Sequence, residues 1–550
     1  MVKNGFSEHS TVSSAVSYAS GSAELPLLGD TIGARLEVIA GQFGERDALV
    51  DVPSGRRWTY AQLNSAVDKL AAGFLRLGVR HGDRVGIWAP NVPEWVLVQY
   101  ATAKVGAILV NINPAYQAHE AGFVMKQSGV RTLISAAAFK TSDYAAMIKE
   151  IRPDAPDLQD VIILGTADWE DLATGSVDPS AVATRLAELD RDDAINIQYT
   201  SGTTGFPKGA TLSHHNILNN GFLVTEVQRF TENDRLCVQV PFYHCFGMVM
   251  SNLGCMAHGS CVVIPAPSFD AVATMEAIAK EHCTALYGVP TMFIAILDHP
   301  HFSEYEFSSL RTGIMSGSPC PVAVMKRVVH AMHMPEITIS YGMTETSPVS
   351  THTACDASIE RRVSTVGTVH PHVEIKLVDP AAGGTVPRGE PGELCVRGYL
   401  VMKGYWEQPD KTAEVIDSDG WMHTGDLATM DAEGFFEIVG RLKDMVIRGG
   451  ENVYPREIEE FLYSHPDIAD VQVVGVPDVK YGEELCAWIR MRDGREPITP
   501  ESLSAFCAGK LAHYKVPRYV HLAEEFPMTV TGKIRKKEMR QESAALLGLR

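Results

Sequence analysis

The sequence predicts an α/β fold with a large N-terminal domain and a small C-terminal domain. The 550 residues exceed the roughly 250 to 300 residues at which a single hydrophobic core stops growing. From residue 59 onward, short apolar stretches alternate with helical stretches, the order typical of a doubly wound α/β layer. After about Val366 the stretches become shorter and are separated by Gly and Pro turns. We therefore expect two doubly wound α/β halves and a small β-rich subdomain within residues 28–442, an α+β domain in residues 443–550, and a flexible tail in residues 1–27.

The first half begins with an amphipathic helix. Thr59 and Gln62 have the spacing of a capping box, and the apolar residues that follow recur at helical spacing through Leu77. After this helix we expect a strand at residues 84–89, a helix at 93–104 and further strands at 106–112, 130–135, 161–164 and 195–199.

In the second half and the C-terminal domain, strands and helices are predicted from the same kinds of pattern. Strands are expected at residues 236–240, 260–264, 285–289, 313–316 and 338–340, and in the β-rich subdomain at 374–378, 392–396 and 435–439. After a boundary at residues 440–444, Pro455 is placed to begin a helix and Thr499 to cap another, with strands at 471–476 and 485–491 between them.

Composition excludes several classes of protein. Hydrophobic content of 45% with 21% charged residues is ordinary for a soluble enzyme, and no apolar run reaches the roughly 18 residues of a membrane helix. The net charge of −19 argues against a nucleic-acid partner. The ten cysteines show no C-x-x-C pair, which favours free thiols over disulfides. The N-terminus has no signal-peptide pattern, so we expect a cytoplasmic protein.

The stretch from Tyr199 to Gly209 is rich in hydroxyls and glycines and carries one cation. Glycines accept positive φ, so successive N–H groups can turn toward one anion. An ordinary turn is the alternative, and Lys208 beside Pro207 favours a phosphate site. The stretch is no Walker A loop, because that motif ends in G-K-[ST] and opens a helix, whereas residues 210–212 after this stretch are expected to be extended. The candidate phosphate-binding residues are Thr200, Ser201, Gly202, Thr203, Thr204, Gly205, Phe206, Pro207 and Lys208.

Three more motifs complete a pattern: Tyr-Gly-Met-Thr-Glu-Thr at residues 341–346, Gly-Trp-Met-His-Thr-Gly-Asp at 420–426 and Thr-Gly-Lys-Ile at 531–534. Together with the phosphate loop they resemble the signature of the AMP-forming adenylating enzymes, which include acyl-CoA synthetases, luciferases and peptide-synthetase adenylation domains. The likeness spans most of the chain.

The resemblance assigns roles at the nucleotide. It implies that Tyr341, followed by Gly342, stacks on adenine, that Thr344 meets the α-phosphate and that Glu345 holds Mg²⁺. Mg²⁺ prefers one or two carboxylates together with phosphate oxygens, so the residue type fits.

The resemblance also covers the adenine loop and the ribose. Gly317 matches a loop along the adenine, where Ser318 and Cys320 depart from the commonest pattern. Asp426 matches the acid that accepts both ribose hydroxyls, and Arg441 matches a second ribose or phosphate contact.

Catalysis is expected to depend on Lys533, which resembles the lysine of the last family motif. A carboxylate attacks the α-phosphorus of ATP, and a preorganised cation stabilises the charge that develops there. Without the resemblance, Lys533 would be assigned to the solvated basic face of residues 535–537. His244 matches a position that orients the substrate carboxylate, with a purely structural histidine as the alternative.

Hinge and thiol residues are also implied by the resemblance. Lys443 lies at the position about which the family's small, mobile domain swings, and Gly449 and Gly450 match the loop beside which the pantetheine arm of coenzyme A passes.

The predicted reaction converts a carboxylic acid and MgATP to acyl-AMP and pyrophosphate, and coenzyme A then takes the acyl group and releases AMP. The overall likeness is closest to fatty acyl-CoA synthetases of the medium-chain type. An aryl-acid ligase, a luciferase-like oxidase and a carrier-protein-loading enzyme remain open, as does assembly into a homodimer. The candidate acyl-pocket residues are Tyr243, Met248, Tyr287, Val289 and Met343.

Overall fold

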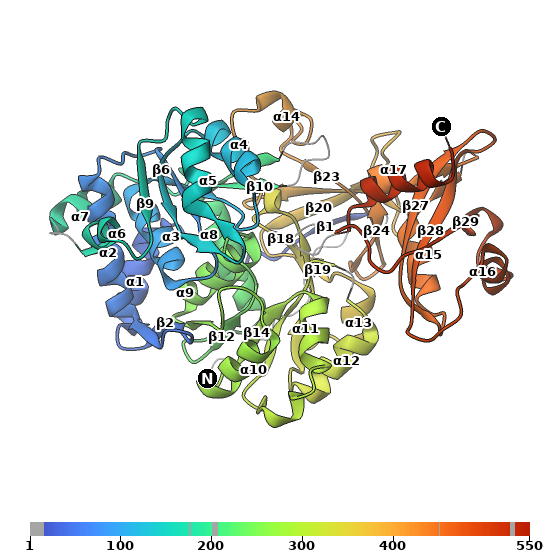
Figure 1. The fold of residues 1–550 in the computed structure, drawn as a ribbon, viewed down its shortest axis with the longest axis horizontal. Coiled ribbons are helices and arrows are strands. Elements are labelled where there is room, and N and C mark those ends of the chain that lie inside the picture. Colours follow the sequence, from blue (N-terminus) through green and yellow to red (C-terminus); the bar gives the residue numbers. More distant parts are fainter. Residues whose placement is uncertain are drawn as a thin grey trace. The chain divides into compact units, whose positions relative to one another are not determined.

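The computed structural model describes residues 16–174, 178–200, 207–318, 320–449, 451–528 and 534–549. Among these residues, one compact unit comprises residues 19–375 and 396–422, and the other comprises residues 16–18, 376–395 and 423–549. Figure 1 shows the helices and strands of both units. The predicted boundary after residue 442 differs from this division and stays a prediction.

The first unit contains a seven-stranded sheet with the order β22-β11-β10-β5-β4-β6-β9. Strands β10, β5, β4, β6 and β9 are parallel, and β11 is antiparallel to both of its neighbours. The bounds are β4 (Arg84–Trp88), β5 (Ile108–Asn111), β6 (Val130–Ser135), β9 (Asp160–Ile163), β10 (Ala194–Thr200), β11 (Lys208–Ser213) and β22 (Gly404–Tyr405).

Helices cover both faces of this sheet, as a doubly wound fold requires. Helices α4 (Ala118–Ser128) and α5 (Tyr144–Ile151) pack on one face, and α2 (Tyr60–Arg76) and α3 (Pro93–Val105) contribute to the core on the other. The predicted capping box of Thr59 and Gln62 at the start of α2 is confirmed.

A second seven-stranded sheet has the order β16-β15-β14-β12-β13-β2-β3 and is parallel except for β3. Strands β2 and β3 of this sheet were not predicted. They form a hairpin that precedes α2 in the chain but belongs to the sheet of the second half. The bounds are β2 (Asp47–Asp51), β3 (Arg56–Thr59), β12 (Arg235–Val238), β13 (Cys261–Ile264), β14 (Ala285–Gly288), β15 (Thr312–Met315) and β16 (Glu336–Thr338).

One hydrophobic cluster joins the two halves. It contains residues of both sheets together with α1 (Ile32–Phe43), α8 (His214–Val227), α9 (Gly254–His258) and the π-helix η2 (Phe246–Leu253). A second cluster packs α10 (Ala271–Glu281), α11 (Pro290–Leu297) and α12 (Val322–Ala331) on the opposite face of the second sheet. The two predicted α/β halves therefore share one continuous core.

The motif around Tyr341 differs from the expected strand end. The predicted strand at residues 338–340 is interrupted: β16 ends at Thr338, and Ile339 exchanges hydrogen bonds with Thr353, whose hydroxyl accepts at 2.9 Å. A new strand, β17 (Ser340–Gly342), then pairs with β18 (Val349–His352) beside β19 (Thr368–Val369). Tyr341 and Gly342 consequently lie inside a strand.

The expected β-rich subdomain is a five-stranded sheet with the order β1-β20-β21-β23-β24. Its strands are β1 (Tyr18–Ser20), β20 (Val373–Val378), β21 (Gly392–Gly398), β23 (Met422–Met430) and β24 (Phe436–Arg441). Strand β1 corrects the expectation of a flexible tail through residue 27. The Ser17 N–H donates to the Val386 carbonyl at 2.8 Å, so backbone pairing orders a segment whose composition carries no strand signal.

The C-terminal part has the predicted α+β character. Strands β25 (Val446–Arg448), β26 (Glu451–Val453), β27 (Ile468–Asp478), β28 (Gly482–Met491) and β29 (Tyr519–Leu522) form one sheet. Helices α15 (Pro455–Leu462) and α16 (Pro500–Cys507) begin where predicted, and α17 (Lys536–Leu546) follows.

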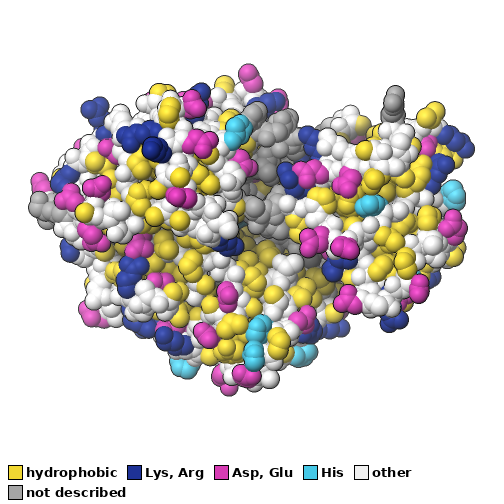
Figure 2. All heavy atoms as spheres, viewed as in Figure 1, with side chains coloured by type: hydrophobic (Ala, Val, Ile, Leu, Met, Phe, Trp, Pro, Cys, Tyr) yellow, Lys and Arg dark blue, Asp and Glu magenta, His cyan; other side chains and the backbone are white. Residues whose placement is uncertain are grey.

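All ten cysteines lie in the described residues as thiols and not in disulfides, as predicted. Among the described helices, none has the length and apolar character needed to cross a membrane. Figure 2 shows Asp and Glu side chains interspersed with Lys and Arg over the face that it draws.

Candidate active site

A hairpin presents the predicted phosphate loop. Strands β10 and β11 pair antiparallel, and Thr200 lies opposite Lys208, so the two ends of the loop are held at one place. Both strands were predicted as extended, and the structure confirms them. The loop residues Ser201, Gly202, Thr203, Thr204, Gly205 and Phe206 lie outside the described residues. Pro207 and Lys208 continue into β11, half-buried.

Glu345 lies beside this hairpin. It belongs to the short 3-10 helix η4 (Thr344–Thr346), and only 5% of its surface is exposed. Its carboxylate oxygen Oε1 accepts a hydrogen bond from the Tyr405 hydroxyl at 2.9 Å and one from the Thr200 hydroxyl at 3.4 Å. The structure thus brings Thr200, Thr344 and Glu345 together, although about 145 residues separate the first from the last.

Tyr405 was not identified from the sequence. The Lys208 ammonium lies over the Tyr405 ring, with its Nζ 4.7 Å from the ring centroid. Burial and the neighbouring Glu345 raise the pKa of Tyr405 above its ordinary range, so the hydroxyl stays a donor at neutral pH. In the sequence, Tyr405 lies only in the short stretch Gly404-Tyr405. In the structure this stretch is strand β22, which pairs with β11.

The predicted adenine residues come from two neighbouring elements. The Ser316 hydroxyl donates to the Ser340 carbonyl at 2.6 Å, which fixes the loop of Gly317 to the strand of Tyr341 and Gly342. Gly317 has φ of +92°, and a Cβ there would approach the Val289 side chain at 3.1 Å. A Cβ on Gly342 would lie 1.7 Å from the Pro348 carbonyl oxygen, so this position also requires glycine.

His244 lies in the turn before η2. Its Nδ1 accepts the N–H of Phe246 at 3.2 Å, which places the proton of a neutral ring on Nε2. Such a ring can donate to a carboxylate but is not preset as a base at Nδ1. The structure therefore is compatible with the orienting role and leaves it a prediction.

The predicted acyl-pocket residues are only partly gathered. Met248 and Tyr287 are fully buried in the shared core, and Met343 packs against the same cluster. The Tyr287 hydroxyl donates to Gln228, and its ring lies 5.7 Å from that of Phe246. Val289 lies beside Gly317, and Tyr243 is half-buried, with its carbonyl accepting from Asn111 at 3.1 Å.

The predicted ribose residues lie in the second unit. Asp426 on β23 faces Arg441 on β24 in the strand register, and Arg441 Nε lies 3.0 Å from Asp426 Oδ1. The Asp426 side chain is 8% exposed and that of Arg441 is 51% exposed. One carboxylate oxygen is thus held by a charged partner, an arrangement that orients the acid.

Glu393 supports the turn before Asp426 and was not identified from the sequence. Its Oε2 accepts from His423 Nδ1 at 2.8 Å, and its Oε1 accepts from the Gly425 N–H at 3.1 Å. With Cys395, these residues form a group whose potential metal-ligand atoms lie within 4.8 Å of one another. The hydrogen bonds already account for the closeness of Glu393 and His423.

The predicted hinge and coenzyme A residues also lie in the second unit. Lys443 belongs to η5 (Leu442–Asp444); burial and Arg441 lower its pKa, and its carbonyl accepts from Arg540 at 3.0 Å. Gly449 has φ of +63°, and a Cβ there would approach the Tyr481 ring at 3.2 Å. Gly450 and Lys533 lie outside the described residues.

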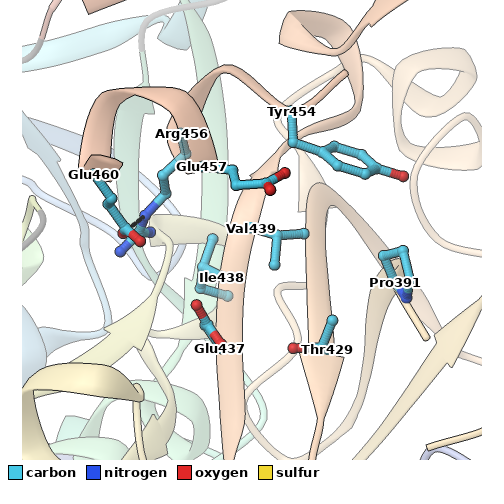
Figure 3. A pocket seen from close by; sticks show the side chains of 9 residues that line it. All are labelled: Pro391, Thr429, Glu437, Ile438, Val439, Tyr454, Arg456, Glu457 and Glu460. Atoms are coloured by element: carbon cyan, nitrogen blue, oxygen red, sulfur yellow. Dashed lines mark hydrogen bonds and ion pairs between the residues drawn. The ribbon is translucent and has the colours of Figure 1, made fainter. Parts of the chain in front are cut away.

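A separate cavity of about 150 Å³ lies between β24 and α15 (Figure 3). Burial and Glu460 raise the pKa of Glu437 at its edge, and Arg456 pairs with Glu460 at 2.8 Å. None of the predicted site residues lines it. The lining residues are Pro391, Thr429, Glu437, Ile438, Val439, Tyr454, Arg456, Glu457 and Glu460.

Comparisons with known proteins identify the family. Residues 36–406 match the AMP-binding enzyme family, and residues 457–533 match the AMP-binding enzyme C-terminal domain. A putative acyl-CoA synthetase of Bacillus subtilis, YngI, is 47% identical over 95% of this chain and 99% of its own length. The mitochondrial medium-chain acyl-CoA ligase ACSF2 of Danio rerio is 44% identical over 97% of this chain and 91% of its own.

A solved structure has the same architecture. The anthranilate CoA ligase AuaEII, crystallised with anthranoyl-AMP, superposes with a TM-score of 0.84 at 26% identity and covers 96% of this chain and 99% of its own. The chain therefore belongs to the AMP-binding enzyme family, and it is an AMP-forming acyl-CoA synthetase of the adenylate-forming superfamily.

Proposed function

We propose that this acyl-CoA synthetase activates a medium-chain fatty acid with MgATP and transfers the acyl group to coenzyme A. The observation that carries the proposal is the meeting of the phosphate hairpin with Glu345, where Thr200 reaches the carboxylate at 3.4 Å and Lys208 lies beyond Tyr405. Similarity to medium-chain ligases supports the chain length, and the apolar surroundings of Met248, Tyr287 and Met343 suit an alkyl chain.

Glu345 is the residue proposed to hold Mg²⁺. It is a buried carboxylate with two hydroxyl donors, and among the described residues no lysine or arginine lies within 4.0 Å of it. A buried carboxylate without a cation is costly, and Mg²⁺ with phosphate oxygens completes such a site. When bound, the ion would neutralise charge on the phosphates.

The remaining roles follow the order of the reaction. The phosphate loop with Lys208 holds the β- and γ-phosphates, and Thr344 contacts the α-phosphate. Tyr341 and Gly317 flank the adenine, and Asp426 accepts the ribose hydroxyls beside Arg441.

The acid itself requires orientation and a cation. His244 orients the carboxylate, and Lys533 stabilises the charge that develops as oxygen attacks the α-phosphorus and pyrophosphate leaves. Holding the mixed anhydride away from water preserves it for the thiol. Lys443 is the proposed hinge, and Gly449 and Gly450 give the pantetheine arm access.

The test compares coenzyme A thioester formation from octanoate with that from benzoate and anthranilate. We expect octanoate to have the highest kcat/KM. A clear preference for either aromatic acid would replace the fatty-acid assignment with an aryl-acid one, the reaction class of the structural neighbour.

The same assay, run without coenzyme A and with hydroxylamine to trap acyl-AMP, tests the proposed cation. Lys533→Ala should lower adenylation about 10² to 10³-fold, the range for loss of a group that stabilises transition-state charge. Lys537→Ala removes an exposed lysine four residues away and is the matched control. Equal rates for the two variants would contradict the assignment of Lys533.

A further inference from the structure

Tyr405 lies between the two charged groups of the candidate phosphate site. Its hydroxyl donates to Glu345 Oε1 at 2.9 Å, and its ring centroid lies 4.7 Å from the Nζ of Lys208. Only 7% of Tyr405 is exposed and Lys208 is half-buried, so both contacts are partly shielded from bulk water.

The backbone around Tyr405 is fixed on both sides. Strand β22 pairs with β11 with Tyr405 opposite Ala210, and the Trp406 N–H donates to the Gly209 carbonyl at 2.7 Å. The Tyr405 N–H donates to the Thr412 hydroxyl at 2.9 Å. The backbone of Tyr405 is therefore held beside β11, the strand that follows the phosphate loop.

The hydroxyl acts on one oxygen of Glu345. Tyr405 and Thr200 both donate to Oε1, and no described residue donates a hydrogen bond to Oε2. A carboxylate held by one oxygen has its other oxygen available to a cation in a fixed direction.

The ring acts on Lys208. A cation over an aromatic face is attracted to it, and the attraction strengthens where water is excluded. The ammonium is therefore held on the side of β11 where Thr200 and Glu345 also lie.

We propose that Tyr405 is a positioning residue, which sets the Glu345 carboxylate for Mg²⁺ through its hydroxyl and the Lys208 ammonium for phosphate through its ring. The inference rests on the proposed function of this site. The hydroxyl and the ring of Tyr405 have separate roles, and separate substitutions can remove each of them.

The test measures binding of α,β-methylene-ATP by calorimetry, once with saturating Mg²⁺ and once with EDTA. Tyr405→Phe removes the hydroxyl and keeps the ring. We expect the gain in affinity that Mg²⁺ provides to fall about tenfold, as for loss of a hydrogen bond to a charged group, while affinity in EDTA stays near that of the parent. Tyr405→Leu should weaken binding in EDTA as well, because Lys208 then loses the aromatic face.

Two further comparisons isolate these effects. In a Glu345→Gln background, Tyr405→Phe should change Mg²⁺ dependence little, and in a Lys208→Ala background the Phe and Leu variants should bind alike in EDTA. Tyr60→Phe is the matched control, since it removes another buried tyrosine hydroxyl, one that donates to the Ser260 carbonyl at 2.6 Å.

The outcomes separate this inference from the function on which it rests. If the parent binds the analogue with a Mg²⁺-dependent gain that Tyr405→Phe leaves intact, the positioning role is wrong and the proposed function stands. If the parent shows no Mg²⁺-dependent binding, the proposed site itself fails. A Tyr405→Phe protein that does not fold would assign the hydroxyl to stability and also overturn the inference.

Discussion

Helix α8 begins with a histidine whose burial makes the first unit sensitive to acid. His214 is fully buried, and its Nδ1 accepts the N–H of Ile32 at 3.2 Å. Burial lowers the pKa of His214 from 6.5 to about 3. The native state therefore holds this ring neutral at every pH at which the enzyme is expected to work.

The pH dependence follows from the direction of this shift. Because the folded pKa lies below the unfolded value of 6.5, the unfolded state takes up the proton first. The contribution to the free energy of unfolding is fully present above pH 6.5 and is lost as the pH falls toward 3. Between pH 7.5 and 5.0 the loss is about 2 kcal/mol, set by the 1.5 units between pH 5.0 and the unfolded pKa.

The substitution His214→Asn isolates this term, because the amide oxygen can replace Nδ1 as acceptor for Ile32 and does not titrate. We expect the variant to lose about 2 kcal/mol less than the parent between pH 7.5 and 5.0. His352, with its pKa lowered to about 3, and His258, with its pKa lowered to about 4, are unchanged in both proteins.

Urea unfolding followed by tryptophan fluorescence measures the effect. Six of the seven tryptophans belong to the first unit, so the signal reports the unit that contains His214. His330→Asn makes the same substitution at an exposed position near the end of α12 and is the matched control for the exchange itself. If His214→Asn and the parent lost the same free energy over this range, the reasoning from burial would be refuted.

Two further predictions concern Glu393 and Lys104. Glu393→Gln should weaken ATP binding up to about tenfold without a large change in melting temperature, because it loses the charge that holds His423 at 2.8 Å in the turn before Asp426; equal affinity in calorimetry would contradict this. Lys104 is fully buried, and its Nζ contacts Asp68 at 2.5 Å, Glu37 at 2.9 Å and Asn64 at 2.9 Å; the Asp68 and Glu37 side chains are 35% and 48% exposed and can be hydrated. Lys104→Met should therefore cost at most about 1 kcal/mol in urea unfolding, whereas Lys104→Ala should cost about 2 to 4 kcal/mol through the cavity left behind; equal losses would show that charge and not volume matters.

Much of the fold could be predicted because its signals are local. The capping box at Thr59 and the helix starts at Pro455 and Thr499 depend on residues within one turn, and the structure has them where predicted. The strands on either side of the phosphate loop are likewise continuous in sequence. The hairpin β2–β3 was missed because its place at the edge of the second sheet depends on pairing with β13, more than two hundred residues later.

In the candidate site, too, residues in contiguous motifs were identified from the sequence, and residues brought in by strand pairing were missed. Glu345 was identified because its motif is contiguous, but its neighbour Tyr405 is 60 residues away and is brought there by the pairing of β22 with β11. Glu393 was missed for the same reason, since its contact with His423 spans 30 residues and two strands.

The sequence by itself determined the family, the two-part α/β architecture and the residue types that nucleotide chemistry needs, because these are written in contiguous motifs and in the periodicity of apolar residues. Only the tertiary structure decided which side chains hold the functional groups in place. Hydrogen bonds such as that of Tyr405 in β22 to Glu345 in η4 form between segments that meet only when the chain has folded, so no contiguous motif indicates them.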